Sequence, residues 1–333
     1  MPAPDPFATH EVTNQPVPLR DYNAFASDAA LQEAVAREGG AFASDHLAAY
    51  GALVGGALLT IGRDANLNRP RLVGFDAYGR RLDDVEFHPA YHRAMAHGME
   101  FGVHNFSWRN ASRPGAHVAR AALLYLGYQA ESGSICPLTM THAAVAALRH
   151  APEVAAVWLP RLMATTYDPR NIPAAVKTAS TIGMGMTEKQ GGSDVRSNTT
   201  RATQEPDGSY AIVGHKFFYS APMSDAHLIL AQATAGITCF LIPRLRPDGS
   251  RNGVRIVRLK DKLGDWSNAS AEVEFTGAEA VRVGDEGRGI ATILDMVALT
   301  RLDCLVGSAG LMRKALAEAL NHTAQRLAFG KCL

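Results

Sequence analysis

The spacing of apolar residues changes abruptly at residues 168–173, and this change most constrains how the chain can fold. The segment reads Asp-Pro-Arg-Asn-Ile-Pro, which interrupts any helix or strand. Upstream, from Asp28 to about Tyr167, apolar residues recur every three to four positions, as in helices packed on a core. Downstream the period falls to two and β-formers dominate, until helical spacing returns after Gly289. The sequence therefore predicts helices, then a β region, then helices again.

Capping and turn signals predict the bounds of individual elements. Asp28 can cap a first helix, and Gly39-Gly40 can end it. Further helices are predicted at 88–103, 115–130, 138–149, 291–305 and 310–327. Strands separated by Asp-Gly, Ala-Gly and Pro-Asp-Gly turns are predicted at 209–220, 226–233, 237–243, 254–260 and 271–275. This spacing favours a small antiparallel barrel or sandwich.

The fold class that follows is α+β, and the chain is long enough for more than one domain. We expect four segments with different sequence character. They are an extended arm at 1–20 with five prolines, a helical domain at 21–175, a β domain at 176–285, and the first helices of a C-terminal helical domain, cut short by the end of the sequence, at 286–333.

Composition excludes several classes of protein. The 333 residues are 47% hydrophobic and 20% charged with a formal net charge of +1, so no global field favours nucleic acid or anionic lipid. The four cysteines are far apart, as expected for reduced thiols rather than a disulfide framework or zinc site. Residues 1–10 lack a secretory pattern, and the longest uncharged run, 47–62, is shorter than the ~20 residues of a membrane span. We expect a cytoplasmic protein without a membrane segment or metal site.

Residues 185–194, Gly-Met-Thr-Glu-Lys-Gln-Gly-Gly-Ser-Asp, form the most specific local motif. Paired glycines allow a backbone to approach a ligand closely, because no Cβ intrudes. Successive N–H groups in such a turn can bind anionic oxygens, and Thr187 and Ser193 add hydroxyls. The motif predicts a loop suited to a nucleotide-like ligand.

The order small-aliphatic-Thr-Glu-x-x-Gly-Gly-Ser-Asp resembles the first signature of the acyl-CoA dehydrogenase flavoproteins, whose layout is also helices, β domain, helices. The resemblance spans essentially the whole chain and is closest to the alkylation-response, or AidB-like, branch. Lys189-Gln190-Gly191 replaces the Pro-Gly-Ala usual in metabolic members. Further segments similar to this branch are 80–85, 87–89, 183–201, 213–216, 224–227 and 260–264.

The resemblance implies FAD as cofactor and names the residues that would bind it. Met184, Met186 and Thr187 would lie along the isoalloxazine, with Gly185 and Gly192 in the same loop, and Ser193 would approach the pyrophosphate. In the later segment 217–220, Phe218 would supply an aromatic contact, Ser220 a hydroxyl near flavin N5, and Tyr219 would lie between them. Arg326, in Arg-Leu-Ala-Phe-Gly, would reach the cofactor diphosphate of a neighbouring subunit.

The dehydrogenation implied by the resemblance needs a carboxylate base facing the flavin. One family position for this Glu aligns with Thr300, which cannot serve, and the other lies beyond Leu333. Asp303 is an alternative, although a helix-surface Asp near Arg301 is the simpler interpretation. Glu188 is expected to be structural, so the catalytic residue stays unknown.

Partners and activity remain open at this stage. The resemblance implies an acyl-CoA substrate such as isovaleryl-CoA, a homo-oligomer, expected to be a tetramer, and duplex DNA as a partner through a terminal domain absent from this sequence. Residues 244–262 are rich in Lys and Arg, as on a solvated face or a site for coenzyme A phosphate or DNA. Three alternatives follow: an acyl-CoA dehydrogenase, a DNA-associated protective flavoprotein with residual activity, or an inactive fragment.

Overall fold

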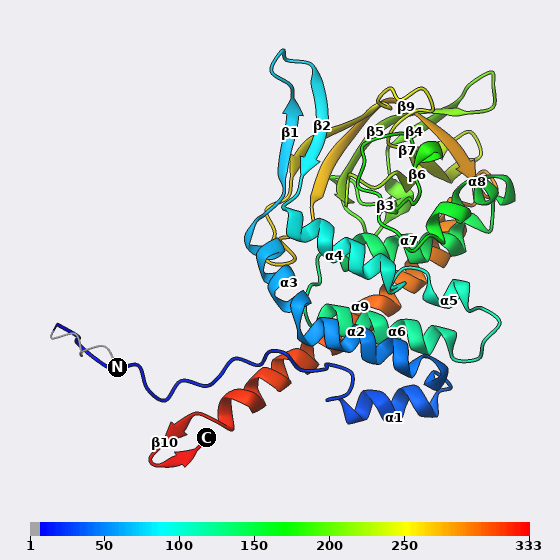
Figure 1. The fold of residues 1–333 in the computed structure, drawn as a ribbon. Coiled ribbons are helices and arrows are strands. Elements are labelled where there is room, and N and C mark those ends of the chain that lie inside the picture. The colour runs from blue at the N-terminus through cyan, green and yellow to red at the C-terminus, as the bar shows by residue number, and fades with distance from the viewer. Residues whose placement is uncertain (1–6) are drawn as a thin grey trace.

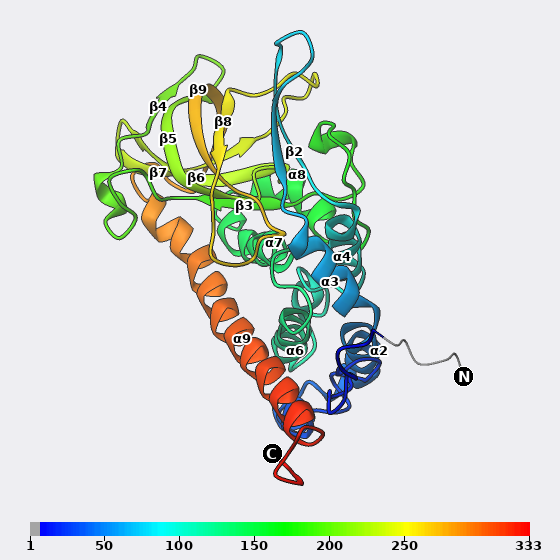
Figure 2. The ribbon, with the colours of Figure 1, turned by 90° about the vertical axis from the view of Figure 1, so that its left-hand side faces the viewer.

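The computed structural model describes residues 7–333 as a layer of helices beneath a β-barrel, with one long helix, α9, running along both (Figures 1 and 2). Residues 1–6 of the predicted arm lie outside the described residues. Residues 7–20 contain no helix or strand. Val17 accepts a hydrogen bond from Asn321 Nδ2 and donates one to Gln325 Oε1, both at 2.9 Å. These contacts hold the arm against the C-terminal end of α9.

The region before residue 168 consists of packed helices, as the apolar period predicted. Asp28 caps the first helix by accepting a hydrogen bond from Leu31 N at 3.1 Å. The helices are α1 (Ala29–Arg37), α2 (Ser44–Gly55), α3 (Ala57–Leu67), α4 (Pro89–Glu100), α5 (Phe106–Arg109), α6 (Ala116–Tyr128), α7 (Ile135–Leu148) and α8 (Pro152–Leu162). Helix α7 is buried almost all round, because it lies between this layer and the β-barrel.

The helical interpretation was wrong at residues 71–86, where β1 (Arg71–Phe75) and β2 (Arg81–Glu86) form an antiparallel hairpin beside the barrel (Figure 1). Asp76 Oδ1 accepts hydrogen bonds from the N–H groups of Tyr78 and Arg80. Gly79 follows with a φ of 77°, a conformation that favours glycine. The turn chemistry therefore outweighs the neighbouring helical pattern.

The β region is a closed barrel with two flanking strands. Strand order is β3-β6-β4-β5-β9-β7, the additional β6–β7 pairing closes the ring, and β8 pairs with β9. The strands are β3 (Ile182–Gly185), β4 (Arg201–Gln204), β5 (Tyr210–Ser220), β6 (Ala226–Ala233), β7 (Gly236–Pro243), β8 (Val254–Leu259) and β9 (Ser270–Val283). Pairing is antiparallel as predicted, except where β3 and β4 run parallel to β6.

Two apolar cores position the barrel against the helices. Ile229 and Phe240 belong to a cluster that fills the barrel interior. Leu228 and Leu241, which alternate with them on the same strands, belong to a second cluster shared with α7, α8 and α9. Strands β6 and β7 are therefore buried on both faces, and the β3 edge lies between barrel and helices.

Helix α9 (Gly289–Thr323) is continuous, whereas the sequence predicted two helices interrupted near residue 307. A Cβ on Gly307 would lie 2.5 Å from the Tyr128 ring, and one on Gly310 would lie 2.4 Å from Tyr125 O, so these glycines allow α9 to pack closely on α6. Beyond α9 a short hairpin, β10 (Leu327–Ala328) with β11 (Lys331–Cys332), ends the chain. None of the helices in the described part of the chain is long and apolar enough to cross a bilayer.

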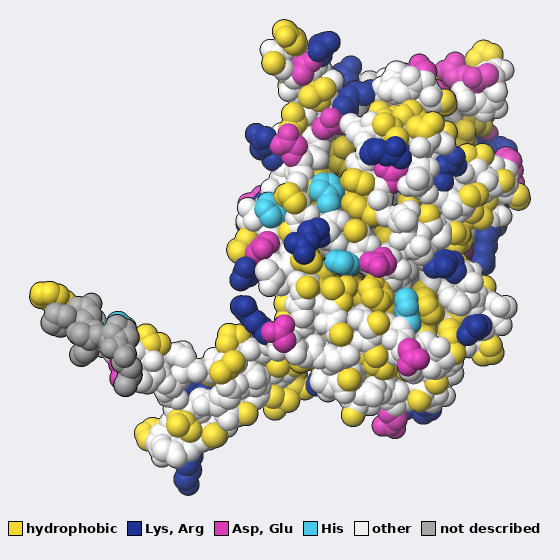
Figure 3. All heavy atoms as spheres, in the orientation of Figure 1, with side chains coloured by type: hydrophobic (Ala, Val, Ile, Leu, Met, Phe, Trp, Pro, Cys, Tyr) yellow, Lys and Arg dark blue, Asp and Glu magenta, His cyan; other side chains and the backbone are white. Residues whose placement is uncertain are grey.

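The outer surface of α9 carries many exposed apolar side chains, and Figure 3 shows hydrophobic atoms along its projecting end. This set comprises Leu294, Leu302, Leu305, Leu311, Met312, Leu316 and Leu320.

Candidate functional site

The loop between β3 and β4 is fixed to the barrel by one buried carboxylate, Glu188. Its Oε1 accepts hydrogen bonds from Lys216 Nζ at 2.8 Å and from the Thr200 hydroxyl at 2.6 Å. Its Oε2 accepts from Thr199 N and from Gln190 Nε2, both at 2.7 Å. Burial alone would raise the pKa of Glu188, but the hydrogen bonds from Lys216 and Thr200 hold it well below its usual range. Glu188 is thus an ionised structural anchor.

Around this anchor the glycines set a tight turn. Glu188 and Gly191 exchange two backbone hydrogen bonds, and Gly191 has a φ of 142°. A Cβ on Gly192 would lie 2.5 Å from the Thr187 hydroxyl oxygen, so glycine is required for this approach. Thr187 O accepts a hydrogen bond from Phe217 N at 2.8 Å, which joins the loop to β5.

Several polar groups of the loop are left free for a ligand. The backbone N–H groups of Gly192, Ser193 and Asp194 donate to no acceptor among residues 7–333. Within the same residues the hydroxyls of Thr187 and Ser193 also have no hydrogen-bond partner. Free consecutive amides beside hydroxyls suit phosphate oxygens. The donor set therefore fits the pyrophosphate of a dinucleotide cofactor.

The end of β5 presents Phe218 and Ser220 on one face and Tyr219 on the other. Phe218 is 45% exposed, and Ser220 Oγ lies 3.1 Å from Ser270 Oγ. Tyr219 is buried inside the barrel, where its ring stacks on His227 with centroids 3.7 Å apart. A Cβ on Gly185 would lie 2.6 Å from the Tyr219 ring. Gly185 therefore provides space for Tyr219, and the Tyr219 side chain points away from the surface that carries Phe218.

Met184 and Met186 are partly buried against the second core cluster, on the helical side of β3. Asn198 Nδ2 donates to Met186 O at 3.0 Å and fixes the start of the loop. The structure thus brings Met186, Thr187, Gly192, Ser193 and Phe218 together through the β3–β4 loop and β5. Sequence reasoning gave no role to Lys216, although a lysine at an inward position of a strand is a detectable signal.

Arg326 does not join this group within one chain. It lies beyond the C-terminal end of α9, where its Nη1 donates to Asn14 O at 2.5 Å. The barrel contacts the other end of the helix (Figure 2). A helix of 35 residues is about 52 Å long, so Arg326 cannot reach the loop of its own chain.

The alternative base, Asp303, is not the helix-surface residue that the sequence suggested. It is buried and forms an ion pair with Arg120 of α6. Thr300, one turn away on α9, donates its hydroxyl to Val297 O at 3.0 Å. Neither residue offers a free carboxylate.

Four of the seven basic side chains in the segment 244–262 form ion pairs with carboxylates from elsewhere in the chain. Arg251 pairs with Asp84 at 2.9 Å, and Arg246 with Glu279 at 3.3 Å. Arg258 and Lys260 both pair with Glu272, at 2.7 and 2.8 Å. These three carboxylates therefore neutralise part of the positive charge of the segment.

A β-barrel packed on a layer of helices, with the long helix α9 against both, defines the chain as a protein of the acyl-CoA dehydrogenase fold. Butyryl-CoA dehydrogenase of Megasphaera elsdenii superposes with a TM-score of 0.68 at 19% identity, covering 87% of this chain and 70% of that one. The complex of Caenorhabditis elegans ACDH-11 with C11-CoA superposes with a TM-score of 0.88 at 29% identity, covering 100% and 58%.

Sequence comparison narrows the class. Residues 14–169 match the family described as adaptive response protein AidB N-terminal domain, and residues 183–278 match the acyl-CoA dehydrogenase middle domain. The protein named putative acyl-CoA dehydrogenase AidB of Escherichia coli K12 is 52% identical over 98% of this chain. The chain belongs to the AidB-like branch of the acyl-CoA dehydrogenase family. It spans 60% of the length of that relative, and 45% of the acyl-CoA dehydrogenase family member 11 of C. elegans, which is 33% identical.

Proposed function

We propose that this chain supplies the FAD-binding part of an acyl-CoA dehydrogenase-type oxidoreductase. The observation that carries the proposal is the anchored loop, with three free amides and two free hydroxyls next to the exposed Phe218 ring. When bound, FAD accepts the hydride that leaves an acyl thioester. Ser193 and the amides of residues 192–194 would hold the pyrophosphate, Thr187 would bond the flavin edge, and Phe218 would cover the ring.

The substrate that we propose is a short acyl-CoA such as isovaleryl-CoA. Family membership supports an acyl thioester, and the C. elegans neighbour was solved with C11-CoA. We further propose a homotetramer in which Arg326 bonds the cofactor diphosphate of another subunit. The distance from Arg326 to the loop of its own chain supports this arrangement. The four free cysteines of the described residues support a cytoplasmic setting.

The alkylation-response link and duplex DNA binding are proposals for the whole protein rather than for residues 244–262. The ion pairs with Asp84, Glu272 and Glu279 argue against a DNA site on this segment. A DNA complex formed by the whole protein should therefore keep its salt dependence when Arg246 and Arg251 are replaced by Gln.

Replacing Thr187 and Ser220 together with Ala is expected to weaken FAD binding about tenfold or more. Each lost hydrogen bond should make the free energy of FAD binding less favourable by about 1 kcal/mol. A change of about 1.4 kcal/mol corresponds to a tenfold change in Kd. Flavin retention after gel filtration, measured by absorbance, tests the change. The control is Thr60→Ala with Ser112→Ala, both exposed and outside this loop. Equal retention in wild type and the Thr187 and Ser220 variant would overturn the loop assignment.

The FAD-loaded 333-residue polypeptide is expected to show no flavin bleaching when mixed anaerobically with isovaleryl-CoA. Thr300 occupies one family position of the base, Asp303 is ion-paired, and Glu188 is fully hydrogen-bonded. Dithionite provides the control, because it should bleach the same sample. Bleaching at a catalytic rate would show that a base lies within this chain.

A further inference from the structure

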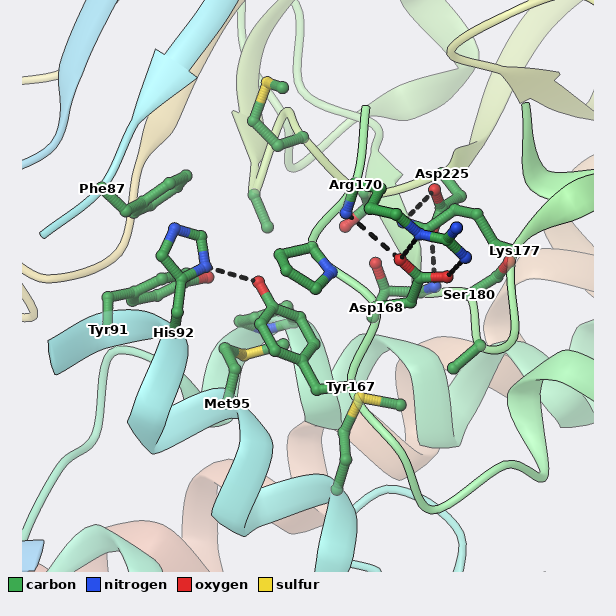
Figure 4. A pocket seen from close by; sticks show the side chains of 18 of the residues that line it. Phe87, Tyr91, His92, Met95, Tyr167, Asp168, Arg170, Lys177, Ser180 and Asp225 are labelled. Carbon is green, nitrogen blue, oxygen red and sulfur yellow. Dashed lines mark hydrogen bonds and ion pairs between the residues drawn. The ribbon is translucent and has the colours of Figure 1, made fainter. Parts of the chain in front are cut away.

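A cavity of about 80 Å³ lies between α4 and one end of the barrel. Figure 4 shows Phe87, Tyr91 and Met95 on one side of it, and Lys177, Ser180 and Asp225 on the other. None of the ten residues predicted to bind FAD lines this cavity. It is therefore separate from the loop that carries the proposed function.

The polar side of the cavity is built from three adjacent strand ends. Ser180 precedes β3, Ser224 precedes β6, and Arg244 follows β7. Ile182 pairs with Ala226, and Ala226 pairs with Pro243, so the three ends lie side by side about 4.8 Å apart. Asp225 links them, because its N–H donates to Thr181 O and its C=O accepts from Arg244 N, both at 2.9 Å.

Each of the three strand ends carries a buried polar atom without a partner. Ser180 and Ser224 are 1% and 3% exposed, and neither hydroxyl forms a hydrogen bond among residues 7–333. Arg244 Nε is likewise buried and unpaired within the described chain. An unsatisfied buried polar group costs about 1–3 kcal/mol, and three residues that carry such atoms line this one cavity.

The charged residues of the cavity wall favour an anionic ligand, because the two carboxylates there already have partners. Asp168 accepts from Arg170 Nε at 2.8 Å and from Thr178 N at 2.9 Å. Asp225 accepts from Lys177 Nζ at 2.8 Å and from Thr181 N at 2.9 Å. Both carboxylates are thus paired.

Arg244 is paired less closely; burial lowers its pKa, although Asp225 and Asp84 both act on its charge and raise that pKa. Its Nη1 donates to the neutral amide of Asn171 at 2.5 Å, and it forms no ion pair with any described residue. The cavity wall therefore holds one cation more than its carboxylates neutralise.

The opposite wall is mostly apolar, although His92 and Tyr167, whose side chains are hydrogen-bonded at 3.0 Å, also line the cavity (Figure 4). Phe87, Tyr91, Met95 and Met99 come from α4 and the turn before it. The cavity volume of about 80 Å³ exceeds the roughly 10–15 Å³ that a single buried water needs, so a small organic group can enter. An inorganic oxyanion would leave this apolar wall without contacts, whereas a short alkyl chain would cover it.

We propose that this cavity is a binding site for a short-chain monocarboxylate. The carboxylate accepts hydrogen bonds from Arg244 and from the hydroxyls of Ser180 and Ser224. The alkyl chain packs against Met95, Met99 and Tyr91 of α4.

The test is calorimetric titration of the purified 333-residue chain with sodium butyrate, butyramide and inorganic phosphate. Butyrate is expected to bind saturably. Butyramide, which has the same shape without charge, and phosphate, which has charge without an alkyl chain, are each expected to bind at least about tenfold more weakly. Absence of saturation by butyrate, or equal binding of butyramide or phosphate, would overturn the proposal.

Two variants and one matched control assign the site. Arg244→Gln and the double variant Ser180→Ala with Ser224→Ala are each expected to weaken butyrate binding at least about tenfold. The serine changes remove hydroxyls that bond no described residue, so the variant should fold even if Arg244→Gln does not. Arg246→Gln, two residues away and paired with Glu279, should bind within about twofold of wild type. Unchanged butyrate binding in the serine variant would show that butyrate does not bind at these hydroxyls, and would overturn the proposal.

Discussion

Replacing Lys216 with Met is expected to lower the free energy of unfolding by about 3–5 kcal/mol. Lys216 and Glu188 are both fully buried, and the change leaves the Glu188 carboxylate without its cation. Lys216 Nζ also donates to Leu230 O at 2.9 Å, so the substitution removes a contact to β6 as well. Urea unfolding at pH 7 measures the effect.

Two further variants distinguish the effect of an unpaired buried charge on stability from the effect of lost side-chain packing. Lys314→Met, which breaks the more exposed pair with Glu318 on α9, should change stability by less than about 1 kcal/mol. The double variant Lys216→Met with Glu188→Gln should be more stable than Lys216→Met alone, because no unpaired charge remains. A loss below about 1 kcal/mol in Lys216→Met would contradict the anchor role of Glu188.

The same pair predicts a pH dependence of defined sign. The folded-state pKa of Glu188 is depressed, so its contribution is fully present above the unfolded pKa of about 4.3. That contribution is lost as the pH falls from there toward the folded-state pKa. The stability difference between wild type and Glu188→Gln should therefore narrow from pH 5 toward pH 3, measured by urea unfolding at each pH. A difference that stays constant or widens would contradict the direction of the shift.

Arg120→Met is expected to lower the free energy of unfolding by about 3–5 kcal/mol as well. Arg120 and Asp303 are each 4% exposed at the side chain, and their ion pair joins α6 to α9. Arg120 Nε also donates to Val103 O at 2.9 Å. Removing the guanidinium leaves the Asp303 carboxylate buried without a cation. Urea unfolding measures the loss, and hydrogen exchange should show faster opening of α9.

The control is Arg63→Met, because Arg63 pairs with its neighbour Asp64 on the surface of α3. This variant should stay within about 1 kcal/mol of wild type. Replacing both buried partners, by Arg120→Met with Asp303→Leu, should restore much of the lost stability. An Arg120→Met protein as stable as the Arg63→Met control would mean that the buried pair contributes little to holding α9.

The sequence by itself determined most element types and the family. Four of the five predicted strands match β5 to β8 within one residue, because alternating apolar residues and Gly-rich turns are local signals. The loop at 185–194 was recognisable because its chemistry is contained in ten consecutive residues. The short strands β3 and β4 were not predicted, since four residues carry too little periodicity.

Only the tertiary structure decided which residues meet. Barrel formation places the Tyr219 ring of β5 against His227 of β6, and packing of α9 on α6 buries Asp303 against a residue 183 positions away. Strand register brought Ser180, Ser224 and Arg244 to one cavity. These contacts join residues far apart in the chain. They depend on barrel closure and strand register, which the local spacing of residues does not predict.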